Sequence, residues 1–290
     1  MERGRSLPTF FIVGPPRTGT SWLHEVLKRR ALLPAVAKET RFFDVHFNRG
    51  TAWYMAHYPR AKNGLRAGEV APTYFASEQA RSRIRELVPR AKIVCIFRDP
   101  FERLVSLYRL KRAYGWIPWS FDQAIVSDPE LTESSRYATH LRAWQKDFGN
   151  EHVLPTLFDD LRDCPQKYMD SLADFIGIPR FKLSGDDGQS VHTSESMTLP
   201  RNYHHTRRAR LMVEWLQARH FGRLLNVARK SPLRKLFVGG GPAFADAPVD
   251  LSLNLLELFR REVDELERML QRDLSGWRPL AAGARSGQAA

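Results

Sequence analysis

The chain has 290 residues, of which 43% are hydrophobic and 11% aromatic, enough to bury a large core and unlike a disordered or collagen-like chain. Its formal net charge of +13 favours anionic partners such as nucleotides, nucleic acid, acidic glycans or membrane surfaces. The two cysteines, Cys95 and Cys164, do not suggest a disulfide framework or a zinc site. No apolar stretch approaches the roughly 20 residues that cross a bilayer. We therefore expect no membrane span and a cytoplasmic location, with a trimmed lumenal domain as the alternative.

The first predicted unit is a strand, a tight loop and a helix. Residues 9–13 are aromatic and branched, which is typical of a short buried strand, and Gly-Pro-Pro at residues 14–16 ends it. A strand that feeds a helix through a tight loop begins a βαβ crossover, so the pattern predicts a parallel sheet. The apolar residues at helical spacing are Trp22, Leu23, Val26 and Leu27.

Residues 34–75 lack strong periodicity and are rich in aromatic side chains. A long irregular stretch inside a compact domain is usually functional. We therefore expect some of these rings to wall an acceptor cleft and others to lie in the core. They belong to Phe42, Phe43, Phe47, Trp53, Tyr54, Tyr58, Tyr74 and Phe75.

The next two predicted elements are a helix and a second strand. Residues 77–88 have a helical pattern, with Ser77 suited to the N-cap. Residues 91–97 form an apolar run that predicts a buried strand. Cys95 lies inside this run, so we expect a buried core thiol.

Two helices are predicted after the second strand. Asp99 is suited to cap the first of them, and Pro100 is suited to its first turn. This helix should run to about residue 114. Residues 132–148 have the pattern of another amphipathic helix.

The remaining predicted elements are a third strand and two helices. Residues 152–158 suggest the strand, although Pro155 argues against a fully paired central position. Residues 165–176 predict a helix closed by Gly177. Residues 251–270 have apolar side chains at steps of three and four, which predicts a long amphipathic helix.

Three strand–helix units predict an α/β protein with a three-layer, P-loop-type fold, in which helices flank a central, mainly parallel sheet. We expect a single domain over residues 1–280. Its core would span residues 9–180, and residues 181–280 would form a helical C-terminal part. The small polar residues at 281–290 predict a flexible tail.

The first chemical motif is the loop at residues 14–21, which reads Gly-Pro-Pro-Arg-Thr-Gly-Thr-Ser. A turn between strand and helix presents backbone N–H groups to phosphate, and the helix N-terminus adds positive potential. The spacing of Gly14 and Gly19 matches the Walker A pattern, but Thr20 stands where that pattern has lysine. The cation is instead Arg17, which counts against an ATPase or kinase. An ordinary strand–helix turn is the alternative.

The second motif follows the strand expected at residues 91–97. Arg98 leaves the end of this strand, and Ser106 lies about two turns into the next helix. A guanidinium and a hydroxyl so placed can hold a second phosphate between them. The alternative is that Arg98 merely pairs with Glu102 and that Ser106 is a helix-surface residue.

Together the two motifs resemble the nucleotide-dependent sulfotransferase superfamily, whose members use 3′-phosphoadenosine 5′-phosphosulfate (PAPS). The resemblance spans roughly residues 9–180. It implies that the first loop holds the 5′-phosphosulfate and that Arg98 and Ser106 hold the 3′-phosphate. Arg17 replaces the usual loop lysine, which keeps the charge but alters reach and geometry. The donor-binding residues that the resemblance implies are Arg17, Thr18, Gly19, Thr20, Ser21, Trp22, Arg98 and Ser106, and it implies no metal.

A third motif reads Lys-Glu-Thr-Arg-Phe-Phe-Asp at residues 38–44. It resembles the glycosaminoglycan and bacterial carbohydrate-type branch of the superfamily. In that branch the Glu of a Lys-Glu pair is the catalytic base, whereas the small-molecule cytosolic branch uses a His. Further segments that resemble the branch are Arg49-Gly, Trp53-Tyr54, Ala-Pro-Thr-Tyr-Phe at 71–75 and Tyr-Ala-Thr-His at 137–140.

The resemblance therefore implies three catalytic residues. Glu39 would be the general base, Arg17 would neutralise the leaving group, and Lys38 would orient the donor or the acceptor. An exposed charged pair is the alternative for Lys38 and Glu39. The C-terminal Lys-Gly-type donor loop of the family is not evident, and Arg201 is a weak substitute for it. The rival bases are His46, His57, His204 and His205, although a lone histidine is more often structural.

The predicted function is transfer of a sulfuryl group from PAPS to a hydroxyl or amine of a carbohydrate, glycolipid or other small acceptor. One alternative is a P-loop small-molecule kinase, but the loop lysine and a clear Mg²⁺-binding acid are missing. The other is a non-enzymatic binder of acidic glycan or nucleic acid. Residues 201–235 prompt it, since they hold ten Lys or Arg and one acid, Glu214. A solvated helical face explains these charges equally well. Binding of nucleic acid leaves the paired phosphate motifs unexplained.

Overall fold

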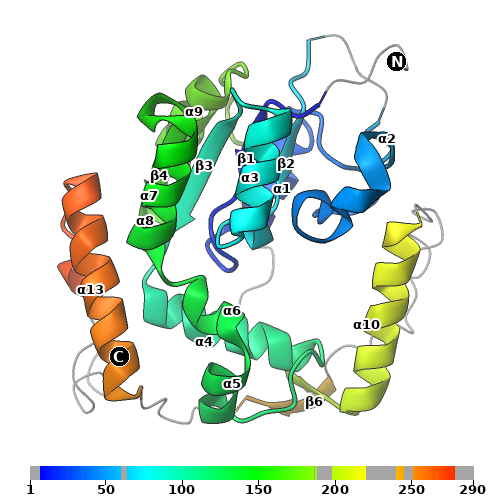
Figure 1. Ribbon diagram of the computed structural model, residues 1–290, viewed down its shortest axis with the longest axis vertical. Coiled ribbons are helices and arrows are strands. Elements are labelled where there is room, and N and C mark those ends of the chain that lie inside the picture. Colours follow the sequence, from blue (N-terminus) through cyan, green and yellow to red (C-terminus); the bar gives the residue numbers. More distant parts are fainter. Residues whose placement is uncertain are drawn as a thin grey trace.

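The computed structural model describes residues 7–59, 64–185, 187, 198–219, 240–244 and 251–277. A central sheet has the strand order β2-β1-β3-β4, and every neighbouring pair is parallel. Helices flank this sheet (Figure 1), so the predicted α/β class is confirmed. The four strands are β1 (Phe10–Ile12), β2 (Gly68–Val70), β3 (Lys92–Phe97) and β4 (Val153–Leu157).

The three layers follow from the alternation of side chains along the strands, which send successive residues to opposite faces. On one face, Phe11 of β1 belongs to a core cluster that includes residues of α3 (Glu78–Leu87), α7 (Tyr137–Phe148) and α13 (Leu253–Leu270). Phe10 and Ile12 pack on the other face against α1 (Thr20–Leu27) and α9 (Pro165–Ile176). Both faces of the sheet are therefore buried.

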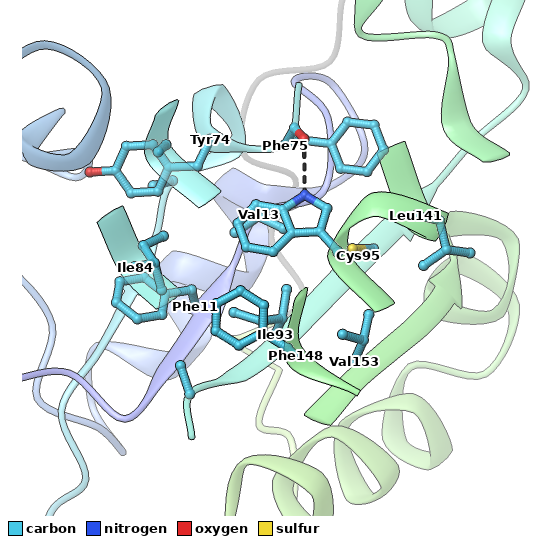
Figure 2. Close-up of a cluster of buried hydrophobic side chains, with 14 of the residues drawn as sticks. Phe11, Val13, Tyr74, Phe75, Ile84, Ile93, Cys95, Leu141, Phe148 and Val153 are labelled. Atoms are coloured by element: carbon cyan, nitrogen blue, oxygen red, sulfur yellow. Dashed lines mark hydrogen bonds between the residues drawn. The ribbon is translucent and has the colours of Figure 1, made fainter. Parts of the chain in front are cut away.

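The face that carries Phe11 is lined with aromatic rings (Figure 2). Its largest member is Trp144 of α7, which is fully buried and donates its indole N–H to the carbonyl oxygen of Phe75 at 2.9 Å. A buried tryptophan needs such a partner for its polar edge. This bond ties α7 to the chain that follows β2.

The remaining elements lie around this core. Helix α4 (Pro100–Ala113) follows β3, and a two-stranded antiparallel sheet pairs β5 (Thr198–Pro200) with β6 (Gly240–Ala243). The other elements are η1 (Phe42–His46, a π-helix), η2 (Phe47–Arg49), α2 (Gly50–Met55), η3 (Pro72–Tyr74), α5 (Phe121–Ser127), α6 (Pro129–Glu133), η4 (Asn150–His152), α8 (Phe158–Asp163), α10 (Tyr203–Ala218) and η6 (Ser275–Trp277). Within the part of the chain described, no helix is long and apolar enough to cross a membrane.

The predicted caps are confirmed. The Ser77 hydroxyl accepts a hydrogen bond from the Ala80 backbone at the start of α3. Asp99 does the same for Glu102 at the start of α4, where Pro100 occupies the first turn. Gly177 closes α9 with a φ of 72°, which glycine adopts without steric cost.

The predictions for β4 and for the first cysteine are also confirmed. Strand β4 lies at the edge of the sheet, as expected for a strand that contains Pro155. Cys95 is fully buried in β3. Burial raises the pKa of its thiol well above the usual range.

Two expectations about secondary structure are wrong. Residues 34–75 contain a strand, β2, which completes the sheet. The helix expected over residues 132–148 starts too early: α7 begins at Tyr137, and residues 132 and 133 belong to the separate helix α6. The two helices separate at Ser134 and Ser135, which are both buried: the Ser134 hydroxyl donates to the Glu130 carbonyl, and the Ser135 hydroxyl accepts from the Arg103 guanidinium. The tail at residues 281–290 and the basic stretch at 220–235 lie outside the described residues.

Candidate functional site

The loop between β1 and α1 is a tight turn with positive φ angles at two positions. Arg17 has a φ of 77° and Gly19, the residue before α1, a φ of 86°. The Thr18 hydroxyl donates to the Pro15 carbonyl oxygen at 2.8 Å and is fully buried. Gly14 packs so closely on β3 that a Cβ there would lie 2.4 Å from the Ile96 nitrogen. The turn therefore leads directly into the N-terminus of α1, an arrangement suited to an anion.

Arg17 joins the first motif to the second. Its Nε donates to the Ser106 hydroxyl at 2.8 Å, across 89 residues of sequence. Burial lowers the pKa of the Arg17 guanidinium, and the positive charge of Arg98 lowers it further. Two cations held close together in a partly buried place favour a bound anion, because an anion would offset their repulsion.

Arg98 has two neighbours, a carboxylate and an aromatic ring. It forms an ion pair with Glu102 at 2.8 Å and lies over the Phe158 ring, 5.0 Å from the centroid. The pairing with Glu102 that the sequence left open is thus present. Ser106 is 3% exposed and bonded to Arg17, so it is not the helix-surface residue considered as the alternative.

Lys38 and Glu39 lie beside the start of α1. Lys38 Nζ lies 3.4 Å from the Thr20 hydroxyl and 3.2 Å from the Ser21 hydroxyl. The same Nζ lies 3.3 Å from Glu39 Oε1, and both side chains are about a quarter exposed. The structure therefore brings the Lys-Glu pair to the start of α1, directly after the loop that contains Arg17.

One histidine that the sequence analysis did not single out lies near this pair. His24 of α1 is mostly buried. Burial, and then the charge of Lys38, lowers its pKa to about 4. His24 is therefore neutral near pH 7, and it belongs to the same helix as Thr20 and Ser21.

The rival histidines lie in other settings. His57 is 2% exposed, and its Nδ1 lies 3.2 Å from the Trp53 carbonyl oxygen and 3.3 Å from that of Tyr54. His46 packs edge-on against the Trp53 ring. His204 and His205 are exposed in the first turn of α10. Arg201 lies directly after β5 and is exposed.

A buried carboxylate in β2 is a second residue that sequence reasoning missed. Glu69 is fully buried, and burial raises its pKa from 4.5 to about 7. Both the backbone N–H and the hydroxyl of Thr40, the residue after Glu39, donate to it. The only sequence signal was an isolated acid within the otherwise uncharged run at residues 67–77.

The aromatic residues expected near an acceptor cleft are mostly core residues. Tyr54 stacks on Phe42 with ring centroids 4.5 Å apart. Trp53 and Phe47 are partly buried and pack at the margin of the cluster. The fully buried or almost fully buried rings are Phe42, Phe43, Tyr54, Tyr58, Tyr74 and Phe75.

Comparison with known proteins adds to this geometry. A family model described as the sulfotransferase domain matches residues 7–199. Human bifunctional heparan sulfate N-deacetylase/N-sulfotransferase 2 is 31% identical over 198 residues, which cover 60% of this chain and 22% of that protein. Human bifunctional heparan sulfate N-deacetylase/N-sulfotransferase 3 is 30% identical over 202 residues, which cover 61% of this chain and 23% of that protein. The chain thus spans less than a quarter of the length of these relatives.

Among solved structures, a sulfotransferase from Alicyclobacillus acidocaldarius aligns with a TM-score of 0.62 at 20% identity, covering 94% of this chain and 100% of that chain. This likeness supports the fold. The family match covers most of the chain and includes the loop of Arg17, the Arg98/Ser106 pair and the Lys38–Glu39 pair. The chain belongs to the sulfotransferase domain family.

Proposed function

We propose that the protein transfers a sulfuryl group from PAPS to a hydroxyl or amine of a carbohydrate, glycolipid or other small acceptor. The observation that carries the proposal is the meeting of three separate motifs at one loop. Ser106 bonds to Arg17, and Lys38 reaches the hydroxyls at the start of α1. The relatives named heparan sulfate N-sulfotransferases favour a carbohydrate acceptor.

In this mechanism the donor is held at both of its phosphate ends. Backbone N–H groups of residues 18–21 and the hydroxyls of Thr20 and Ser21 would bind the 5′-phosphosulfate at the N-terminus of α1, beside Trp22. Arg98 and Ser106 would bind the 3′-phosphate and so discriminate PAPS from ATP. Arg98 would then exchange its exposed partner Glu102 for a more highly charged one.

The chemical step forms a bond from the acceptor oxygen or nitrogen to sulfur and breaks the bond from sulfur to the bridging oxygen. Adenosine 3′,5′-diphosphate leaves, and Glu39 takes the proton of the acceptor as attack proceeds. Arg17 would offset the charge that grows on the bridging oxygen. Lys38, which contacts the Thr20 and Ser21 hydroxyls at the start of α1, would orient the donor or the acceptor.

Glu39→Gln tests the base. This variant should bind adenosine 3′,5′-diphosphate as the unmodified protein does, while kcat should fall at least ~10²-fold, as expected when a general base is lost. Binding is measured by calorimetry, and turnover by transfer of labelled sulfate from PAPS to a panel of glycans, lipids and phenols. Turnover close to that of the unmodified protein would remove Glu39 from the mechanism. Tighter binding of ATP–Mg²⁺ than of adenosine 3′,5′-diphosphate would favour the kinase alternative.

A further inference from the structure

The buried carboxylate of Glu69 is bonded to the peptide that links Glu39 to Thr40. Its Oε1 accepts the Thr40 backbone N–H at 2.8 Å and the Thr40 hydroxyl at 2.7 Å. The first of these bonds fixes the plane of the peptide whose carbonyl belongs to Glu39. Glu69 itself is fixed because it lies in β2, which pairs with β1.

The other side of the Glu69 carboxylate is held by tyrosines. Tyr54 donates its hydroxyl to Oε2 at 2.7 Å, and the Tyr58 hydroxyl lies 3.0 Å from that of Tyr54. The Tyr74 hydroxyl lies 3.4 Å from Oε1 and from the Thr40 hydroxyl. All three tyrosines are buried, so the carboxylate has one well-defined position.

The segment that Glu69 holds is irregular. Arg41, directly after Thr40, has a φ of 54°, a region that non-glycine residues seldom adopt. A π-helix, η1, follows at Phe42. Backbone of this kind persists only when its surroundings hold it in place, and it often occurs at functional sites.

Burying a carboxylate is costly unless donors satisfy it. The raised pKa of Glu69 shows that the cost is not fully recovered here. Two of its donors come from Thr40, and Lys38 and Glu39 directly precede Thr40 in the chain. The main effect of burying this carboxylate is therefore to fix the backbone of this segment at Thr40.

From this geometry we infer that Glu69 is a positioning residue, which holds the Glu39–Thr40 peptide so that Glu39 and Lys38 face the start of α1. The inference rests on the proposed role of Glu39 as the base. Glu69 acts through Thr40 and has no proton-transfer role of its own.

The test compares three variants. Glu69→Ala removes the acceptor, and kcat should fall at least about tenfold with the KM for PAPS within about threefold, because a misplaced base slows chemistry more than donor binding. Glu69→Gln keeps an oxygen that can accept both Thr40 bonds, so kcat should stay within about threefold. Thr40→Val removes the hydroxyl with little change of shape and should lower kcat to an intermediate degree. This variant tests the inference if Glu69→Ala does not fold.

Glu262→Ala is the matched control. Glu262 of α13 is nearly buried and accepts the backbone N–H of Thr139 at 3.1 Å and its hydroxyl at 2.6 Å. Glu262 thus accepts the same two kinds of bond from Thr139 that Glu69 accepts from Thr40. The kcat of Glu262→Ala should stay close to that of the unmodified protein. An equal loss of kcat in Glu262→Ala and Glu69→Ala would overturn the inference, since both effects would then reflect general loss of packing.

Two further outcomes separate the inference from the proposed function. In the Glu39→Gln background, Glu69→Ala should slow kcat by less than about twofold, because residues that act as a unit are not additive. Full additivity would overturn the positioning role, as would a folded Glu69→Ala with unchanged kcat. A loss in Glu69→Gln as large as in Glu69→Ala would assign a role to the charge instead. The failure of Glu39 as the base would be seen separately, in Glu39→Gln alone.

Discussion

Arg98 is the residue through which the proposed site for the 3′-phosphate can be tested most directly. Arg98→Ala should weaken the affinity for adenosine 3′,5′-diphosphate by at least about tenfold, since a charge-assisted hydrogen bond to a phosphate is lost. The affinity for adenosine 5′-phosphate should change little, because that ligand has no 3′-phosphate. Calorimetry with both ligands measures the difference. Equal losses for the two ligands would contradict the assignment of Arg98 to the 3′-phosphate.

Glu69 gives a second prediction at the scale of a residue, since its pKa of about 7 lies above its usual 4.5. Between these values the folded protein binds more protons at this site than the unfolded chain, so stability falls as pH rises. The decrease in the free energy of unfolding should approach roughly 3 kcal/mol above pH 7. The groups that face Glu69 are Thr40, Tyr54, Tyr58, Tyr74 and, through its charge, Glu39.

Glu69→Gln should abolish this part of the pH dependence, because a glutamine amide does not titrate. Urea unfolding at pH 5 and pH 8 measures it. The unmodified protein should lose more stability between the two values than the variant does. Parallel losses would show that Glu69 titrates as it does in the unfolded chain.

At the scale of elements, the loop before α1 depends on the contact between Gly14 and β3. Gly14→Ala would place a methyl group 2.4 Å from the Ile96 backbone nitrogen. We expect a loss of about 2 kcal/mol or more in the free energy of unfolding, as for other overpacked sites. Gly276→Ala is the control, since nothing lies within 4 Å of its added carbon, and it should change stability by less than about 0.5 kcal/mol. Similar losses in the two variants would contradict the close packing of the loop on β3.

The elements also show what the sequence can predict. Strands β1, β3 and β4 are apolar runs, and the caps of α3, α4 and α9 use residues with strong local preferences, so local pattern located them. Strand β2 has only three residues, one of them a charged glutamate whose burial depends on Thr40 and Tyr54. The break between α6 and α7 depends on Ser135 bonding to Arg103, 32 residues away. Partners so distant in sequence leave no local pattern.

At the scale of the molecule, the candidate site also combines features that local sequence patterns predict with contacts between residues distant in sequence. Short motifs in the sequence singled out the loop at residues 14–21, the Arg98/Ser106 pair and the Lys38–Glu39 pair. The bond from Arg17 to Ser106 and the bonds from Thr40 to Glu69 are tertiary contacts, and only the fold reveals them. The single-domain organisation and the cytoplasmic location stay predictions, as do the class and the identity of the acceptor.

The bond between Arg17 and Ser106 has a thermodynamic consequence for the whole donor site. Arg17 belongs to the 5′-end of the proposed site and Ser106 to its 3′-end, so each end forms part of the surroundings of the other. Occupation of one end therefore changes the free energy of occupying the other, and the change is reciprocal. If the proposed site binds PAPS or adenosine 3′,5′-diphosphate, the free energy of binding either ligand should therefore differ from the sum for two independent fragments.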